Sequence, residues 1–208
     1  MENLSGSPSP ARHPMAQYLV LLGVAGSGKT AVGKALSERL ATTFIEGDDY
    51  HPRVNVEKML RGLPLLDDER WPWISHVAGA MRSHYARCEQ TRRQDRIDPP
   101  PQHEPVGHDR LAALPFAICA CSPMRLPHRD YLVSQVGEPI AFIELSVPRE
   151  MLRARIRERE DHYQATLQLD SQIAMMEPLH EHELGFTVDG SLPVEAVVAQ
   201  ICERLATS

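Results

Sequence analysis

Short apolar runs alternate with amphipathic segments along most of the chain. The first run, Tyr-Leu-Val-Leu-Leu at residues 18–22, is bounded by glycine and predicts a strand that is buried on both faces. Residues 31–40 then place Val32, Leu36 and Leu40 at helical spacing. Similar patterns predict strands at 43–46, 114–121, 140–147 and 185–188, and helices at 54–60, 73–86, 129–135, 149–160 and 194–206. This alternation indicates an α/β fold in which a mostly parallel, five-stranded sheet lies between two layers of helices.

Two segments depart from the pattern. Residues 1–15 are rich in Ser, Pro and Gly, which predicts a disordered lead-in before one domain at 16–208. Residues 89–110 are polar and charged and include three consecutive prolines, so we expect a surface insert within that domain. The helix before this insert should begin directly after Pro72, because proline suits a first helical turn, and should fray near Arg87.

Charge and cysteine content narrow the classes of partner. The formal net charge of −6 over 208 residues argues against a nucleic-acid partner, although a few local arginines suffice for a small anion. No apolar run approaches the ~18 residues that a membrane span needs, so we expect no membrane partner. The four cysteines lack paired C-x-x-C spacing, which favours a reducing compartment and a cytoplasmic protein. Cys119 and Cys121 are two residues apart on a predicted strand, and we expect both to pack in the core on one face.

A glycine-rich loop carries the clearest chemical signal. Residues 23–30, Gly-Val-Ala-Gly-Ser-Gly-Lys-Thr, match the P-loop pattern G-x-x-x-x-G-K-[ST] and lie between a predicted strand and a predicted helix. Backbone N–H groups of such a loop point at phosphates, and the helix N-terminus adds a favourable dipole. We expect ATP and Mg²⁺ here, with Lys29 on the β- and γ-phosphates and the Thr30 hydroxyl on magnesium. The predicted nucleotide-binding residues of the loop are Gly23, Ala25, Gly26, Ser27, Gly28, Lys29 and Thr30.

An acidic turn follows the second predicted strand. Its sequence, Glu46-Gly-Asp-Asp-Tyr-His-Pro52, directs the carboxylates of Glu46 and Asp48 to the same side. One carboxylate can take part in the coordination shell of a magnesium ion, and we assign this role to Glu46. The other, Asp48, can accept the proton of a hydroxyl group. A capped and solvated acidic turn without chemistry stays open as the alternative.

From residue 46 to residue 73 the chain resembles the gluconokinase family of small P-loop kinases. The matching segments are Glu46-Gly-Asp-Asp-Tyr-His-Pro52, Asn55-Val-Glu-Lys-Met59, Gly62-Leu-Pro-Leu65 and Asp67-Asp-Glu-Arg-Trp-Pro-Trp73. Together with the P-loop at residues 23–30, these segments belong to a resemblance that covers about residues 18 to 201. It implies a P-loop kinase-like fold with a small helical lid at about 155–176, a homodimer, and ATP-dependent phosphorylation of D-gluconate to 6-phospho-D-gluconate.

The resemblance also implies roles for residues at matching positions. Asp48 corresponds to the carboxylate that orients the attacking hydroxyl, and Lys29, Arg125 and Arg159 to groups that stabilise the transferring phosphoryl. Arg155 and Arg159 correspond to nucleotide-binding arginines of the lid. The implied substrate-binding residues are Asp48, His51, Lys58, Arg70, Arg125, Arg129 and His162. Plainer alternatives stay open, since His51 suits a turn and Lys58 and the arginines of 149–160 suit solvated helix faces; we expect Trp71 and Trp73 to be packing anchors.

The third matching segment departs from the family pattern. It reads Ser122-Pro-Met-Arg-Leu-Pro-His-Arg-Asp-Tyr-Leu132, with Pro123, Arg125 and His128 where the family has Ala, Lys and Tyr. Arginine keeps the positive charge of lysine but not its shape. Two alternatives therefore accompany the gluconate kinase: a kinase of another small hydroxy acid such as shikimate, and a nucleotide-binding regulator without catalysis.

Overall fold

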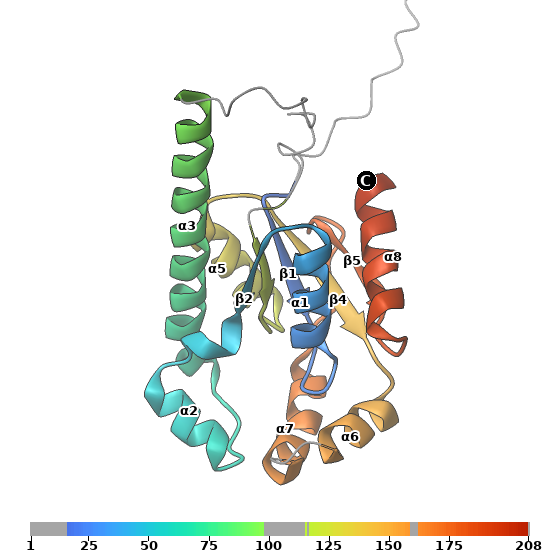
Figure 1. Ribbon diagram of the computed structural model, residues 1–208. Helices are drawn as coiled ribbons and strands as arrows, with labels where there is room; N and C mark the ends of the chain where they lie inside the picture. Colours follow the sequence, from blue (N-terminus) through green and yellow to red (C-terminus); the bar gives the residue numbers. More distant parts are fainter. Residues whose placement is uncertain (1–15, 98–114, 116, 159–161, 208) are drawn as a thin grey trace, which may run out of the picture.

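Five parallel strands form one sheet in the order β2-β3-β1-β4-β5 (Figure 1). The computed structural model describes residues 16–97, 115, 117–158 and 162–207. The strands are β1 (Tyr18–Leu22), β2 (Thr43–Glu46), β3 (Ala117–Ala120), β4 (Ile140–Ser146) and β5 (Gly185–Asp189). Strand β1 is central and all five of its residues are buried, as its unbroken apolar run predicted. The predicted five-stranded α/β sheet is confirmed, and every strand pair in it is parallel.

Helices cover both faces of the sheet, which gives the expected three layers. The helices are α1 (Lys29–Arg39), α2 (Arg53–Leu60), α3 (Asp67–Ile97), α5 (Leu126–Val136), α6 (Arg149–Arg157), α7 (His162–Met175) and α8 (Val194–Thr207). Tyr18, Val20 and Leu22 pack against α3 and α5, while Leu19 and Leu21 pack against α1 and α8. No helix in the described ranges is long and apolar enough to cross a membrane.

Cys119 of β3 and Cys121, which follows the strand, confirm a prediction made from their spacing. Cys119 and Cys121 are fully buried and belong to the same apolar cluster as Tyr18 and Val20. Burial raises the pKa of the Cys121 thiol well above its ordinary value, because a thiolate would be poorly solvated there. These two thiols are therefore packing residues.

Helix α3 differs from its prediction at both ends. It begins at Asp67, so Pro72 lies inside it rather than before it. The Glu69 carboxylate accepts the backbone N–H of Leu66 at 2.6 Å and caps the helix start, and three acidic residues in the first turn favour the helix dipole. The helix also continues past Arg87 to Ile97, so residues 89–97 are helical and not part of a surface loop. The remainder of the predicted insert, 98–110, and the predicted lead-in, 1–15, lie outside the described residues.

Three helices lie beyond the carboxyl ends of the strands, where ligands bind in such sheets (Figure 1). Helix α2 lies on the side of β2, and α6 and α7 lie on the side of β4. Leu152 and Ile156 of α6 and Leu169 of α7 form a buried cluster with Val24 of the glycine loop. The helix pair α6–α7 is thus packed directly on the loop that follows β1.

Candidate functional site

The glycine loop between β1 and α1 has the conformation that its sequence predicts. Gly26 and Gly28 have φ angles of 81° and 95°, in the left-handed region that favours glycine. A Cβ on Gly26 would also lie 3.1 Å from the Ile156 side chain and from the Leu152 carbonyl oxygen. Helix α1 begins at Lys29, so the amides of its first turn have no carbonyl acceptor within the helix. The buried Ser27 hydroxyl has no hydrogen-bond partner, and the first-turn amides without an acceptor in the helix fit a phosphate group.

Thr30 and Glu46, the two predicted magnesium residues, lie together. The Thr30 hydroxyl donates a 2.7 Å hydrogen bond to Glu46 Oε2, although the two residues are 16 positions apart. Burial raises the pKa of the Glu46 carboxyl, despite the hydrogen bond from Thr30. Magnesium prefers oxygen ligands and keeps several waters, so one hydroxyl and one carboxylate beside a phosphate fit this ion.

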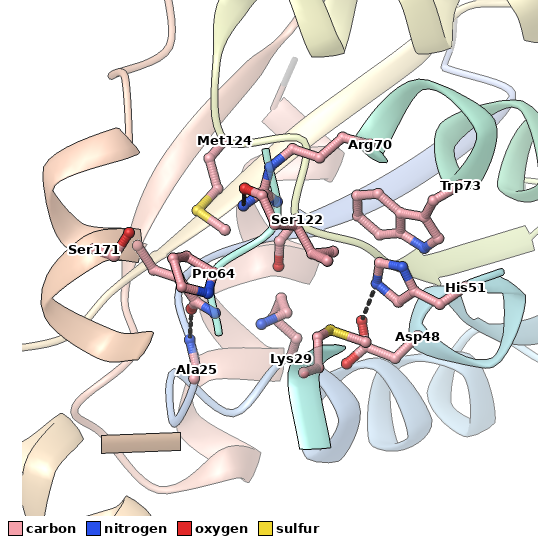
Figure 2. Close-up of a pocket in the computed structure, with 13 residues that line it drawn as sticks. Ala25, Lys29, Asp48, His51, Pro64, Arg70, Trp73, Ser122, Met124 and Ser171 are labelled. Atoms are coloured by element: carbon pink, nitrogen blue, oxygen red, sulfur yellow. Dashed lines mark hydrogen bonds and ion pairs between the residues drawn. The ribbon is translucent and has the colours of Figure 1, made fainter. Parts of the chain in front are cut away.

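A cavity of about 170 Å³ opens next to the loop (Figure 2). Lys29 and Asp48 line it, with Asp48 carried by the short 3₁₀ helix η1 (Gly47–Tyr50) that follows β2. The Lys29 ammonium donates to the carbonyl oxygens of Gly23 at 2.8 Å and Val24 at 3.2 Å, while the Asp48 side chain is largely exposed to the cavity and solvent. The cavity therefore places a carboxylate and a cation from the P-loop at one site, as the sequence predicted.

His51 forms a wall of this cavity. Its ring stacks on that of Trp73, with centroids 4.4 Å apart and planes inclined by 9°. The Trp73 indole N–H donates to the Gly47 carbonyl oxygen at 2.8 Å, which fixes the stack to η1. Burial lowers the pKa of His51 to about 4; the Asp48 carboxylate opposes this shift and the Arg70 cation adds to it. His51 is therefore neutral at pH 7, and its buried Nδ1 atom has no hydrogen-bond partner.

This depressed pKa predicts a loss of stability in mild acid. Below pH 6.5 His51 becomes protonated in the unfolded chain, whereas in the folded protein it stays neutral until about pH 4. The free energy of unfolding therefore falls as the pH is lowered across that window. We expect His51→Phe, which keeps a ring on Trp73, to lose about 1 kcal/mol less stability than the wild type between pH 7.5 and 5.5. Urea unfolding at both pH values measures the difference, and equal losses would place the His51 pKa near its ordinary value.

Arg70 lines the cavity from α3 and is buried, with a relative exposure of 7%. One Nη atom donates to the Leu65 carbonyl oxygen at 3.3 Å, and the buried Nε atom has no partner. Burial lowers the pKa of Arg70, although Asp67 and Glu69 oppose that shift. A buried guanidinium with an unused donor that lines a cavity suits an anionic group of a ligand. Figure 2 shows Arg70 on the side of the cavity away from Lys29 and Asp48.

Two predicted substrate residues point elsewhere. The Lys58 ammonium donates to both carboxylate oxygens of Glu69, at 2.9 and 2.7 Å. The Arg125 guanidinium pairs with Asp67 and with Glu177, the latter at 3.2 Å, and these carboxylates raise its pKa. Neither side chain lines the cavity. In this geometry both cations hold protein carboxylates, and their predicted roles in substrate binding have no direct contact to support them.

Arg129 has a structural role in place of the predicted substrate contact. Its side chain is fully buried and donates to both oxygens of the Glu183 carboxylate, at 2.6 and 2.8 Å. Three further hydrogen bonds reach the carbonyl oxygens of Met124, Glu177 and Pro178. All five N–H donors of the guanidinium are thereby used within the protein. Arg129 ties α5 to the segment between α7 and β5.

Removing this cation should cost much of the folding stability. Arg129→Met leaves the Glu183 carboxylate buried without its partner, and breaking a buried pair in this way costs about 3–5 kcal/mol. The free energy of unfolding from urea titration measures the loss. The exposed Arg53, which pairs with Glu57 on α2, supplies the matched control: Arg53→Met should cost less than about 1 kcal/mol. Similar small losses in both variants would contradict a structural role for Arg129.

The lid residues are described in part. Arg155 Nη1 donates to the Gly190 carbonyl oxygen at 3.0 Å and lies 4.0 Å from the position of a Cβ on Gly28. The guanidinium is therefore beside the P-loop, and its role in nucleotide binding stays a prediction. Arg159 lies outside the described residues, and of His162 only its place as the first residue of α7 is described.

Several residues of the cavity were not selected from the sequence as site residues. Ser122 lies two residues after the end of β3 and donates to the Gly23 carbonyl oxygen at 2.9 Å. Its position after a buried strand was a signal that could have identified it, because the ends of parallel strands meet at one edge. Met124 and Trp73 also line the cavity, as do Ser171 and Gln172 of α7. Trp73 is both the expected packing anchor and a wall of the site.

Known proteins with gluconokinase names are similar to this chain. A probable gluconokinase of Schizosaccharomyces pombe is 34% identical over 172 residues, which cover 81% of this chain and 77% of that protein. A gluconokinase of Gluconobacter oxydans is 31% identical, with 89% of each chain covered. The crystal structure of a gluconokinase from Sinorhizobium meliloti aligns with a TM-score of 0.69 and 28% identity over 94% of both chains. No family model matches the chain.

Proposed function

Because the chain belongs to the gluconokinase family, we propose that it transfers the γ-phosphoryl group of ATP to the 6-hydroxyl of D-gluconate. The product is 6-phospho-D-gluconate, and the nucleotide enters as the magnesium complex. The observation that carries the proposal is the placement of the buried Arg70 across one cavity from Asp48 and Lys29. Gluconate has a carboxylate at one end of a hydroxylated chain and the reacting hydroxyl at the other, which matches such an arrangement.

The residues of the site divide the chemistry of transfer among them. Asp48 orients the acceptor hydroxyl and takes up its proton, while Lys29 balances negative charge on the transferring group. Thr30 and Glu46 would hold magnesium, which would supply positive charge to neutralise the phosphates. Arg70 binds the carboxylate, because its guanidinium belongs to a residue that lines the cavity and suits an anionic group. Positioning and charge neutralisation supply most of the catalysis in this class of reaction.

The helix pair α6–α7 supports the proposal of a lid. Its buried cluster with Val24 couples the pair to the P-loop, and Ser171 and Gln172 of α7 border the cavity. A lid over this cavity would exclude water from the transferring phosphoryl. We also propose a homodimer, which the resemblance to the family implies, and a cytoplasmic location, which the cysteine content favours.

A coupled enzyme assay tests the function by measuring the ADP that the purified protein forms from ATP in the presence of Mg²⁺ and a candidate acceptor. We expect ADP release to depend on gluconate and to be much weaker with glucitol, which has the same chain but no carboxylate for Arg70. Shikimate in the same panel tests the alternative of another hydroxy acid. A protein that binds ATP and releases no ADP with any acceptor would support a regulator instead.

A further inference from the structure

Gln172 of α7 links the P-loop to the cavity in which we propose that the acceptor binds, called the acceptor cavity below. Its side-chain oxygen accepts a 2.7 Å hydrogen bond from the backbone N–H of Ala25, which is 147 positions away. The same glutamine lines the cavity that contains Lys29, Asp48 and Arg70. One side chain thus contacts the nucleotide loop and borders the acceptor site at once.

The turn of α7 that carries Gln172 is held in place on both sides. Leu169 is fully buried, and Ile173 packs against the cluster that contains Val24. Asp170 forms ion pairs with Arg149 at 2.7 Å and with Arg153 at 3.4 Å, both from α6. Gln172 is therefore carried by a turn that is anchored to the loop and to α6, rather than by a free surface helix.

The chemistry of the amide defines what it can offer to a ligand. A glutamine side chain has one acceptor oxygen and two N–H donors on its nitrogen. The orientation of the amide follows from its partner, since placing the nitrogen at Ala25 would oppose two donors. With the oxygen on Ala25, the nitrogen keeps its N–H donors for other oxygen atoms. At the junction of P-loop and cavity, such donors suit a phosphoryl or hydroxyl oxygen.

We propose that Gln172 is a positioning residue for phosphoryl transfer. Its oxygen holds Ala25, and with it the P-loop, at the acceptor cavity, and its nitrogen donates to an oxygen at the point of transfer. The inference rests on the proposed kinase function and assigns to the lid a specific contact in that reaction. Since the other loop amides and Lys29 hold the phosphates, the loss of Gln172 should affect turnover more than ATP binding.

Two substitutions separate the two contacts of the amide. Gln172→Ala removes both, and we expect kcat at saturating ATP and gluconate to fall about 10- to 100-fold, as misplaced reactants do. Gln172→Glu keeps an oxygen for the Ala25 N–H but loses the N–H donors, so kcat should stay low while that hydrogen bond persists. Gln200→Ala on α8, another mid-helix glutamine remote from the cavity, is the control and should keep wild-type kcat.

Calorimetric titration with a nonhydrolysable ATP analogue and amide hydrogen exchange complete the test. We expect analogue affinity to change less than about threefold, and Ala25 to exchange faster in Gln172→Ala but not in Gln172→Glu. A Gln172→Ala kcat within about twofold of wild type, or an affinity loss as large as the kcat loss, would overturn the proposal. If ADP release by the wild-type protein does not depend on gluconate, the proposed function is refuted instead. The variants are then measured with the acceptor identified in the substrate panel. Unchanged Ala25 exchange in Gln172→Ala overturns the inference whatever the acceptor is.

Discussion

Replacing Lys29 by alanine is expected to reduce gluconate-dependent ADP release by about 10³-fold or more. Lys29 supplies a cation at the P-loop, where its ammonium lies within 2.8 Å of the Gly23 carbonyl oxygen and beside the cavity that contains Asp48. Negative charge on the transferring group would then be left without this cation, and charge stabilisation of this kind is usually the largest single contribution to catalysis. Single-turnover measurements at saturating ATP determine the loss directly.

Lys34 provides the control for Lys29 on the same helix. It is an exposed lysine of α1, five residues further along, and it does not line the cavity. Lys34→Ala should retain wild-type turnover, which separates the local role of Lys29 from a general effect of removing positive charge. Near-normal rates in Lys29→Ala would contradict the role assigned to the P-loop.

Local sequence patterns predicted the sheet and the glycine loop at its carboxyl edge. The run 18–22 is apolar throughout because both faces of β1 are covered, and the loop after it needs left-handed glycines at Gly26 and Gly28. The proximity of Thr30 and Glu46 follows from the same logic, since a P-loop helix and the end of the neighbouring strands meet at one edge of the sheet. Each of these features depends on residues close in sequence or on the topology of a parallel sheet.

The cations of the acceptor half could not be assigned in this way. Lys58, Arg125 and Arg129 are paired with carboxylates that lie 11, 58 and 54 positions away, respectively. Such pairs depend on how α2, α3, α5 and the segment before β5 pack together, and no local pattern encodes them. Arg70 differs because its Nε atom is buried without a partner, a distinction that only the packed structure reveals.

The start of α3 was missed for a different reason. Pro72 is a strong local signal for a first helical turn, but the Glu69 carboxylate caps the N–H of Leu66 six residues before the proline. The helix therefore begins earlier and tolerates the proline inside it. Because Arg70 follows Glu69 in this first turn, the cap also fixes the residue that we assign to the substrate carboxylate.

Replacing Asp48 by asparagine is expected to lower kcat by about 10²–10⁴-fold, the usual contribution of a positioned proton acceptor. Asparagine keeps the size of the side chain and one carbonyl oxygen, but it cannot take up the proton of the acceptor hydroxyl. Asp48 lines the cavity beside Lys29, and its Oδ1 atom lies 3.9 Å from Nε2 of His51. Steady-state kinetics with saturating gluconate measure the loss, and affinity for an ATP analogue should be largely unchanged.

Asp49→Asn makes this experiment specific, because it changes the neighbouring carboxylate by the same chemistry. Asp49 is an exposed residue of η1 and does not line the cavity, so its amide variant should keep wild-type turnover. A low kcat in Asp48→Asn alone would assign the proton acceptor to that one carboxylate. Equal losses in both variants would point to the overall charge of η1, and retained turnover in Asp48→Asn would remove Asp48 from the chemistry. In that last case Glu46, a second carboxylate close enough to interact with the Lys29 charge, would be the next candidate for the proton acceptor. Glu46 and its Thr30 partner would then act on the acceptor hydroxyl rather than on magnesium.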